Sequence, residues 1–243
     1  MNRNDQRSQD ELRPVEITLG IQSYAEGSVL IKAGDTHVIC SASIEESVPN
    51  FLKDQNKGWI TAEYNMLPRA TLTRTRRENI KKGRTHEIQR LIGRCLRTSV
   101  DLNSIGERSI LIDCDVVQAD GGTRTASITG SYVALYLAVL SLAVLSLVEE
   151  NKIEKMPVIN QLAAVSVGIL KQQVLLDLCY EEDSEADADF NIVMNNNGDF
   201  IEVQGTAEQK PYSKELLDEV LRVGSNGIKQ LFDKQNEAIS YMT

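Results

Sequence analysis

The 243-residue sequence predicts an α+β fold in which helices pack on β-sheets. Segments rich in Val, Ile and Thr, with apolar residues at alternate positions, are typical of strands. Segments whose apolar residues recur every three or four positions are typical of helices. Both kinds occur along the whole chain, in the order strands, helix, strand, helix, strands, helix. The length is sufficient to bury one substantial core or two small ones.

The chain before residue 70 is predicted to be mostly β-structure. Strands are expected at 15–19, 28–32 and 37–44, and the glycine-containing turns between them favour an antiparallel meander. A polar loop with Pro49 then leads to a further strand at 59–64.

The first predicted helix covers residues 85–102 and is amphipathic. Its apolar residues share one side, whereas Arg90, Arg94 and Arg97 lie on the other faces and make the exposed side basic. A strand of alternating apolar residues follows at 109–117.

Residues 126–148 form an uncharged run of 23 residues. This length could span a bilayer. The run contains five Ser or Thr residues and no Lys or Arg at its C-terminal flank, so a helix buried between other elements is the preferred interpretation and no membrane partner is expected. Within it, residues 138–142 are repeated in tandem as 143–147, and the duplication is expected to lengthen the helix.

The second half is predicted to contain four strands and a long final helix. Polar and glycine-containing turns separate the strands into two hairpins. The strands are expected at 162–170, 174–180, 190–194 and 200–204, and the helix at 213–240 with a break or bend near Gly224 and Gly227.

The charge is unevenly distributed along the chain. The net charge of −9 argues at first against a nucleic-acid partner, because affinity for a polyanion comes largely from Lys and Arg. Residues 69–97, however, contain ten Lys or Arg and two acidic residues, so this segment carries +8 and the rest of the chain −17. Since acidic partners at helical spacing are scarce there, a solvated helix face explains the segment poorly.

The cysteines and the N-terminal residues indicate a cytoplasmic protein. The four cysteines lie far apart without a C-x-x-C pair, so a zinc site is improbable and free thiols are expected. The first 14 residues are polar and lack the apolar core of a secretory signal.

A first candidate site is the segment Asp120–Thr125, between a predicted strand and a predicted helix. Two glycines allow a sharp turn whose N–H groups face an anion, and the helix start adds a positive dipole. Arg124 contributes a planar guanidinium suited to phosphate. In isolation, such a Gly-Gly turn is more often structural.

A second candidate is the acidic segment 181–189, which has six carboxylates in nine residues. A calcium loop starting at Asp183 is excluded, because Ala188 stands where that loop needs glycine and Met194 where it needs glutamate. Asp183 on the loop and Asp189 at the mouth of a strand could hold Mg²⁺ against a phosphodiester. A solvated acidic loop is the alternative.

A third candidate is Arg84, which follows Gly83 at the start of the first helix and could meet the same anion as Arg124. The two histidines, His37 and His86, lie in a strand and in the basic segment, and no Ser/His/Asp or Cys/His set is evident. Covalent nucleophilic catalysis is therefore not expected.

At these segments the sequence resembles the ribonuclease PH family. The resemblance extends in order along nearly the whole chain, and one departure is Gln6, which replaces the glycine of the family's N-terminal Asp-Gly-Arg. The matching segments are Asp10–Pro14, Ala25–Leu30, Gly58–Thr71, Gly83–Arg97, Asp113–Gly130, Ala163–Gly168, Glu181–Ser184 and Glu202–Glu208.

The resemblance implies one ribonuclease PH domain over residues 1–243, with two βαβα-type halves related to the second domain of ribosomal protein S5. It implies a homohexameric ring of three dimers. The implied phosphate-binding residues are Arg84, Gly122, Thr123 and Arg124, the implied catalytic and Mg²⁺-binding pair is Asp183 and Asp189, and the arginines implied in subunit association and tRNA binding are Arg69, Arg74 and Arg77.

The implied reaction is phosphorolysis, in which inorganic phosphate as co-substrate removes 3′-terminal nucleotides from tRNA precursors and other RNA, ribosomal RNA included, as nucleoside diphosphates. Two other classes are weighed against it: a non-catalytic RNA-binding ring subunit of an exosome-like assembly, and a hydrolytic metal-dependent nuclease. Inert ring subunits lack the phosphate arginine or the acidic pair, whereas this chain has Arg84, Arg124, Asp183 and Asp189. A hydrolase would release monophosphates without added phosphate.

Overall fold

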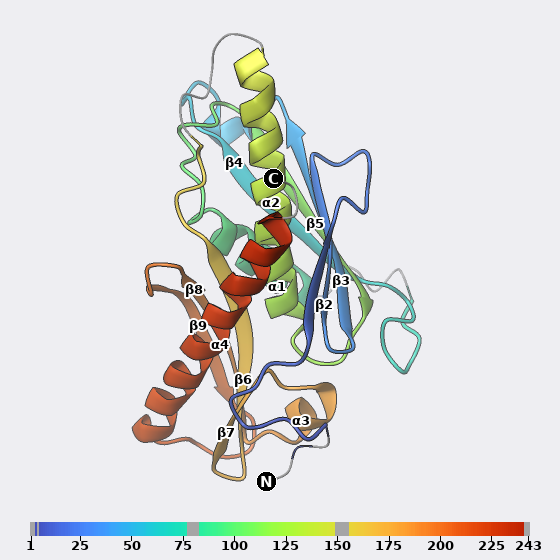
Figure 1. Cartoon of the computed structure of the whole chain (residues 1–243), viewed down its shortest axis with the longest axis vertical. Coiled ribbons are helices and arrows are strands. Elements are labelled where there is room, and N and C mark those ends of the chain that lie inside the picture. The colour runs from blue at the N-terminus through green and yellow to red at the C-terminus, as the bar shows by residue number, and fades with distance from the viewer. Residues whose placement is uncertain (1–2, 4, 77–82, 149–155, 241–243) are drawn as a thin grey trace.

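The computed structural model describes residue 3 and residues 5–76, 83–148 and 156–240, with the backbone alone for 144–148. It confirms the α+β class, with two β-sheets and helices packed on them (Figure 1). The first half contains β1 (Val15–Leu19), β2 (Gly27–Ala33), β3 (Thr36–Glu45), a 3-10 turn (Asn50–Leu52), β4 (Trp59–Met66), α1 (Gly83–Leu96), β5 (Ser109–Gln118) and α2 (Thr123–Val148). The second half contains β6 (Leu162–Leu170), β7 (Gln173–Leu176), α3 (Tyr180–Glu185), β8 (Ala188–Asn195), β9 (Phe200–Ala207) and α4 (Lys214–Ser240).

The first sheet has the strand order β1-β2-β3-β5-β4. Strands β1, β2 and β3 form the expected antiparallel meander, and β5 continues it antiparallel to β3. Strand β4 pairs in parallel with β5, so α1 forms the crossover between the two strands. Because β4 and β5 are parallel, their carboxyl ends lie at the same edge of the sheet. Helix α1 follows β4 and helix α2 follows β5, so both helices begin after that edge.

The second sheet has the order β7-β6-β8-β9, with every pair antiparallel. All nine residues of β6 are buried, because α2 packs against this strand from one side and α4 from the other. Ala164 joins the apolar cluster around α2, whereas Val165 and Val167 join the cluster under α4. A strand covered on both faces has a continuous apolar sequence, as β6 does.

Helix α2 runs lengthwise through the molecule and contacts β2, β3 and β6 (Figure 1). It passes through both copies of the tandem repeat, as expected, and ends at Val148. The stretch Thr123–Ala143 is long and apolar enough to cross a membrane, but 78% of the apolar window in it is buried inside the fold. Because the core helix of a folded protein has the same composition, this stretch is weak evidence for a membrane span.

Several predicted boundaries are wrong. Helix α1 ends at Leu96 rather than at 102, because Val100 pairs with Val158 as an isolated β-bridge. The strand predicted at 174–180 stops at Leu176, and the helix α3 begins at Tyr180 in what was expected to be an acidic loop. Contacts between residues distant in the sequence, and not the local sequence pattern, determine where these elements end.

Helix α4 also runs without the break expected near its glycines. A side chain at Gly224 would lie 2.5 Å from Ile192, and one at Gly227 would lie 2.7 Å from Leu176. The two glycines therefore allow the helix to approach the second sheet closely, which is a packing role and not a hinge.

Candidate active site

The segment from Asp120 to Arg124, here called the glycine loop, joins β5 to α2 in a conformation that requires glycine. Gly121 and Gly122 have φ values of +73° and +64°, which few other residues adopt without strain. A Cβ at Gly121 would also lie 2.4 Å from the backbone oxygen of Leu178. Both glycines thus serve the turn, and the first one allows the chain leading to α3 to pass directly beside it.

Two side chains from the first sheet fix the glycine loop in place. The hydroxyl of Thr36, which is fully buried, donates to the Gly121 carbonyl at 2.6 Å and accepts from the Asp120 N–H at 2.9 Å. The hydroxyls of Tyr64 on β4 and Thr123 lie 2.8 Å apart and share a hydrogen bond. Burial raises the pKa of Tyr64, so this phenol stays protonated at neutral pH.

Helix α2 begins at Thr123, three residues before the predicted start, so Thr123 and Arg124 lie in its first turn. The Arg124 guanidinium donates through Nη1 to Oε1 of Gln204 on β9 at 2.9 Å. The same nitrogen lies 3.7 Å from Oε1 of Glu87 on α1, and 19% of the Arg124 side chain is exposed. The arginine is therefore held beside the helix start, where unbonded N–H groups and the helix dipole favour an anion.

Arg84 is the second residue of α1 and is exposed. Its charge acts both on Tyr64, which holds Thr123, and on Asp183. Arg124 acts on the same two groups, so the two arginine-bearing helix starts lie near each other, in keeping with the parallel β4–β5 pair. Among the described residues, Arg84 forms no ion pair, so its guanidinium is available for a ligand.

Asp183 lies on α3, contrary to the expected loop, and Asp189 lies near the start of β8. Although part of Asp183 is open to solvent, partial burial of its carboxyl group raises its pKa above the ordinary value. The Asp189 carboxylate raises this pKa further, whereas the charges of Arg84 and Arg124 lower it. The structure therefore brings the two aspartates and the two arginines together.

The other acidic residues around Asp183 have different surroundings. Glu182 is buried in a bidentate pair with Arg3, with both nitrogen–oxygen distances 2.7 Å. Asp187 is buried, accepts the Lys171 backbone N–H at 3.0 Å, and lies 3.7 Å from Lys210. Glu182 and Asp187 therefore stabilise the fold around α3. Asp183 and Asp189 form no ion pair within the part of the chain that the structure describes.

A buried ion pair supports the glycine loop from the inner side. Arg13 donates to Asp177 through its backbone N–H and through Nε and Nη2, at 2.8, 3.0 and 2.7 Å. Its remaining nitrogen hydrogen-bonds to the Asp120 carbonyl. Burial alone would raise the pKa of Asp177, but Arg13 and Arg7 hold it below the ordinary value. Arg13 therefore links the glycine loop to the segment between β7 and α3.

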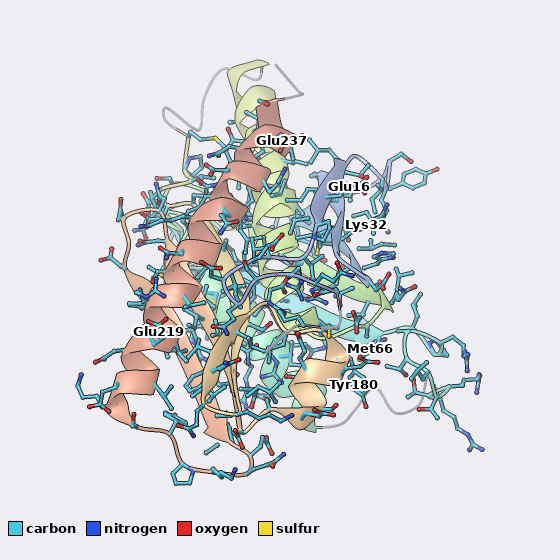
Figure 2. The ribbon with its side chains drawn as sticks, turned by 60° about the horizontal axis from the view of Figure 1, so that its bottom comes forward. Glu16, Lys32, Met66, Tyr180, Glu219 and Glu237 are labelled. Carbon is cyan, nitrogen blue, oxygen red and sulfur yellow. The ribbon has the colours of Figure 1, made fainter. Side chains whose placement is uncertain are left out.

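Two of the three arginines predicted for RNA and subunit contacts, Arg69 and Arg74, do not join this site. Arg69 and Arg74 are exposed on the loop after β4, and Arg69 donates to the Leu72 carbonyl at 3.0 Å. Figure 2 shows this loop projecting beyond Met66, away from the body of the molecule, with Tyr180 marking the start of α3. Leu72 on the same loop is 88% exposed. Arg77 lies outside the described residues.

The sequence did not single out several residues that hold the site together. Tyr64, Gln204 and Glu87 contact the glycine loop or its arginine from three different elements. Each is far from the glycine loop in sequence, and only the order of the strands brings them near it. Their one signal was their position inside segments that resemble a known family.

Comparison with known proteins identifies the family. The model of the 3′ exoribonuclease family, domain 1, matches residues 11–141, and that of domain 2 matches residues 160–227. The chain belongs to the 3′ exoribonuclease family. The chain is 56% identical to the Ribonuclease PH of Dehalococcoides mccartyi, with 97% of each chain covered. It is also 56% identical to the Ribonuclease PH of Bacillus pumilus, with 96% of each chain covered.

Solved structures agree with this 3′ exoribonuclease assignment. The chain is similar to a subunit of the Archaeoglobus fulgidus exosome with RNA bound to the active site, with a TM-score of 0.81 and 25% identity. The match covers 96% of this chain and 92% of that one. The comparison therefore extends across both sheets, and the resemblance found in the sequence is confirmed.

Proposed function

We propose that this 3′ exoribonuclease works by phosphorolysis, using inorganic phosphate to release 3′-terminal nucleotides as nucleoside diphosphates. The observation that carries the proposal is the convergence of two arginines at helix starts with two aspartates that have no cationic partner among the described residues. The arginines and helix starts suit an inorganic anion, and the carboxylates suit the metal and proton requirements of the reaction.

In this reaction an oxygen of phosphate attacks the phosphorus that joins the last nucleotide to the rest of the RNA. The new P–O bond forms as the bond from phosphorus to the O3′ of the preceding nucleotide breaks, and that O3′ takes up a proton. Phosphate and diester are both anions, so Arg84 and Arg124 must offset their repulsion. Because a diester bond is exchanged for an anhydride, the reverse reaction makes the protein a nucleotidyltransferase when diphosphates are abundant.

Asp183 and Asp189 fit a divalent cation. Burial raises the pKa of Asp183 and repulsion by Asp189 raises it further. A cation between the two carboxylates relieves this repulsion. No group of three or more His, Cys, Asp or Glu suited to a metal occurs among the described residues. Two carboxylates with water and substrate oxygens are the usual set for Mg²⁺. When bound, Mg²⁺ would supply charge neutralisation at the reacting phosphorus.

We further propose a cytoplasmic homohexamer, a ring of three dimers, that acts on tRNA 3′ ends and on ribosomal RNA. The support is the similarity to an exosome with RNA bound to its active site and the projecting loop that carries Arg69 and Arg74. An exposed loop with Leu72 and several arginines has the composition of a surface that contacts another subunit or a polyanion. Arg77 stays a prediction from the sequence.

The deciding experiment identifies the nucleotide that is released. The purified full chain is incubated with RNA labelled in its 3′-terminal nucleotide, with Mg²⁺, and with or without inorganic phosphate. Phosphorolysis releases labelled nucleoside diphosphate only when phosphate is present. Release of monophosphate without phosphate would indicate a hydrolase, and binding without release would indicate a non-catalytic ring subunit. Either result would contradict the proposal.

A further inference from the structure

We propose that Gln204 is a positioning residue that orients Arg124 for phosphate. The inference rests on the proposed function and extends it to a residue outside the predicted site. Gln204 lies on β9 in the second half of the chain, whereas Arg124 lies on α2 in the first half. The orientation of the phosphate-binding arginine is thus set by the opposite sheet.

The contacts of Gln204 define the direction of its amide. Its Oε1 accepts from Arg124 Nη1 at 2.9 Å, and its Nε2 donates to Glu87 Oε1 at 2.8 Å. A guanidinium can only donate and a carboxylate can only accept. The reversed amide would place like groups together, so Arg124 and Glu87 fix Gln204 in one orientation, with its oxygen toward the arginine.

Gln204 also determines how much of the Arg124 charge remains for a ligand. Glu87 lies 3.7 Å from Arg124 Nη1, close enough to attract the guanidinium but beyond hydrogen-bond distance. The amide of Gln204 hydrogen-bonds to both groups, so Glu87 does not close a bidentate pair with Arg124. Gln204 therefore occupies one nitrogen of the guanidinium. No other hydrogen bond or ion pair of this guanidinium occurs among the described residues, which leaves Nε and Nη2 for phosphate.

Strand β9 is well placed for this role because it contacts α1 at two successive inward positions. Glu202, two residues before Gln204 and on the same face of the strand, pairs with Arg94 at 3.2 Å. Gln204 reaches Glu87, about two turns earlier on the same helix. Glu202 does not reach Arg124, so it offers a matched control that lies on the same strand and contacts the same helix.

The test uses two variants of nearly equal size. Gln204→Met keeps the length of the side chain and removes both hydrogen bonds, and Gln204→Glu adds a carboxylate that competes with phosphate for Arg124. Losing one orienting hydrogen bond corresponds to a rise of about fivefold in the KM for phosphate. We expect that rise in Gln204→Met, a rise of at least about tenfold in Gln204→Glu, and in both an unchanged KM for RNA.

Glu202→Gln is expected to leave the KM for phosphate within twofold of the parent value. Phosphate binding is measured in parallel by titration calorimetry, and folding by the thermal midpoint. An unchanged phosphate affinity in well-folded Gln204→Met and Gln204→Glu would overturn the inference, as would an equal loss in Glu202→Gln. If the parent protein binds phosphate but releases no diphosphate, the proposed function fails while calorimetry still decides the role of Gln204.

Discussion

Two groups of arginines and carboxylates surround the start of α2, and they differ in how completely the charges are paired. On the inner side, Arg3 and Arg13 are buried and bind Glu182 and Asp177 with several short hydrogen bonds each. On the outer side, Arg84 is exposed, and neither it nor Asp183 has an ion-pair partner in the described chain. Glu182 and Asp183 are adjacent in sequence but belong to opposite groups.

Whether a charged side chain has an ion-pair partner separates the residues that stabilise the fold from those of the candidate site. A buried charge needs a partner to offset its desolvation, so the inner pairs are required for the fold. Like charges left unpaired beside each other repel and favour binding of an opposite charge. Burial, and after it the charge of Asp189, raises the pKa of Asp183. We expect substitutions in the outer group to affect turnover and those in the inner group to affect stability.

The largest effect is expected for Asp189→Asn in the outer group. The amide keeps the shape of the carboxyl but removes its charge, so turnover should fall by about 10³-fold or more. RNA binding, followed by fluorescence anisotropy, should be retained. Glu185→Gln, on the exposed side of the same acidic segment, is the control and should keep its turnover. Normal phosphorolysis by Asp189→Asn would show that the Asp189 carboxylate is not required for turnover.

The next largest effect is expected for Asp177→Asn in the inner group. The change leaves Arg13 buried without its counter-charge, so the free energy of unfolding should fall by about 3–5 kcal/mol. Because the folded-state pKa of Asp177 is lowered, its contribution is complete above the unfolded value near 3.9 and is lost as pH falls below it. Urea unfolding at pH 7 and at pH 3 should therefore show the difference shrinking in acid. A constant difference across that range would contradict the ion-pair explanation.

Arg124→Ala returns to the outer group and tests binding of the co-substrate. Loss of the guanidinium at the helix start should raise the KM for phosphate by about 10²-fold. The thermal midpoint should change little, because the direct partners of the guanidinium are one amide and a more distant carboxylate. Arg90→Ala, an exposed arginine on α1, is the control. A large loss of stability in Arg124→Ala would show that this arginine is needed for the fold.

The smallest effect concerns the segment that carries the inner arginines. Gln6 has a φ of +65°, a conformation that favours glycine. Gln6→Gly should therefore stabilise the protein by about 0.5–1 kcal/mol, measured by chemical unfolding. Gln9→Gly, at an exposed position without positive φ, should destabilise it instead. Stabilisation in both variants, or in neither, would show that backbone strain at Gln6 is not responsible.

The sequence predicted the strands well because they alternate or are continuously apolar, and β1 and β6 have the expected bounds. It failed where distant contacts decide the backbone. The bridge from Val100 to Val158 ends α1 early, and contact with the sheet keeps α4 unbroken at Gly224. Helix α3 has only six residues, fewer than two turns, and is too short for periodicity to reveal it.

The candidate site divides in the same way. Arg84, Arg124 and Asp189 all lie close enough to Asp183 for their charges to act on it. These four residues could be found in the sequence because each lies at a glycine turn, a helix start or an acidic cluster. The groups that hold them are ordinary polar residues on strands. Thr36, Tyr64 and Gln204 become recognisable only when the sheet order places them beside the glycine loop.

The pair of Arg3 and Glu182 links positions 179 residues apart. During synthesis Arg3 is made before Glu182, which follows about ten seconds or more later at ordinary elongation rates. Arg3 has no counter-charge from Glu182 during that time. The helix that carries Asp183 is therefore held by Arg3 only after Glu182 has been made. Because Asp183 and Asp189 closely follow this position, the acidic pair beside Arg84 and Arg124 cannot form before that segment has been made.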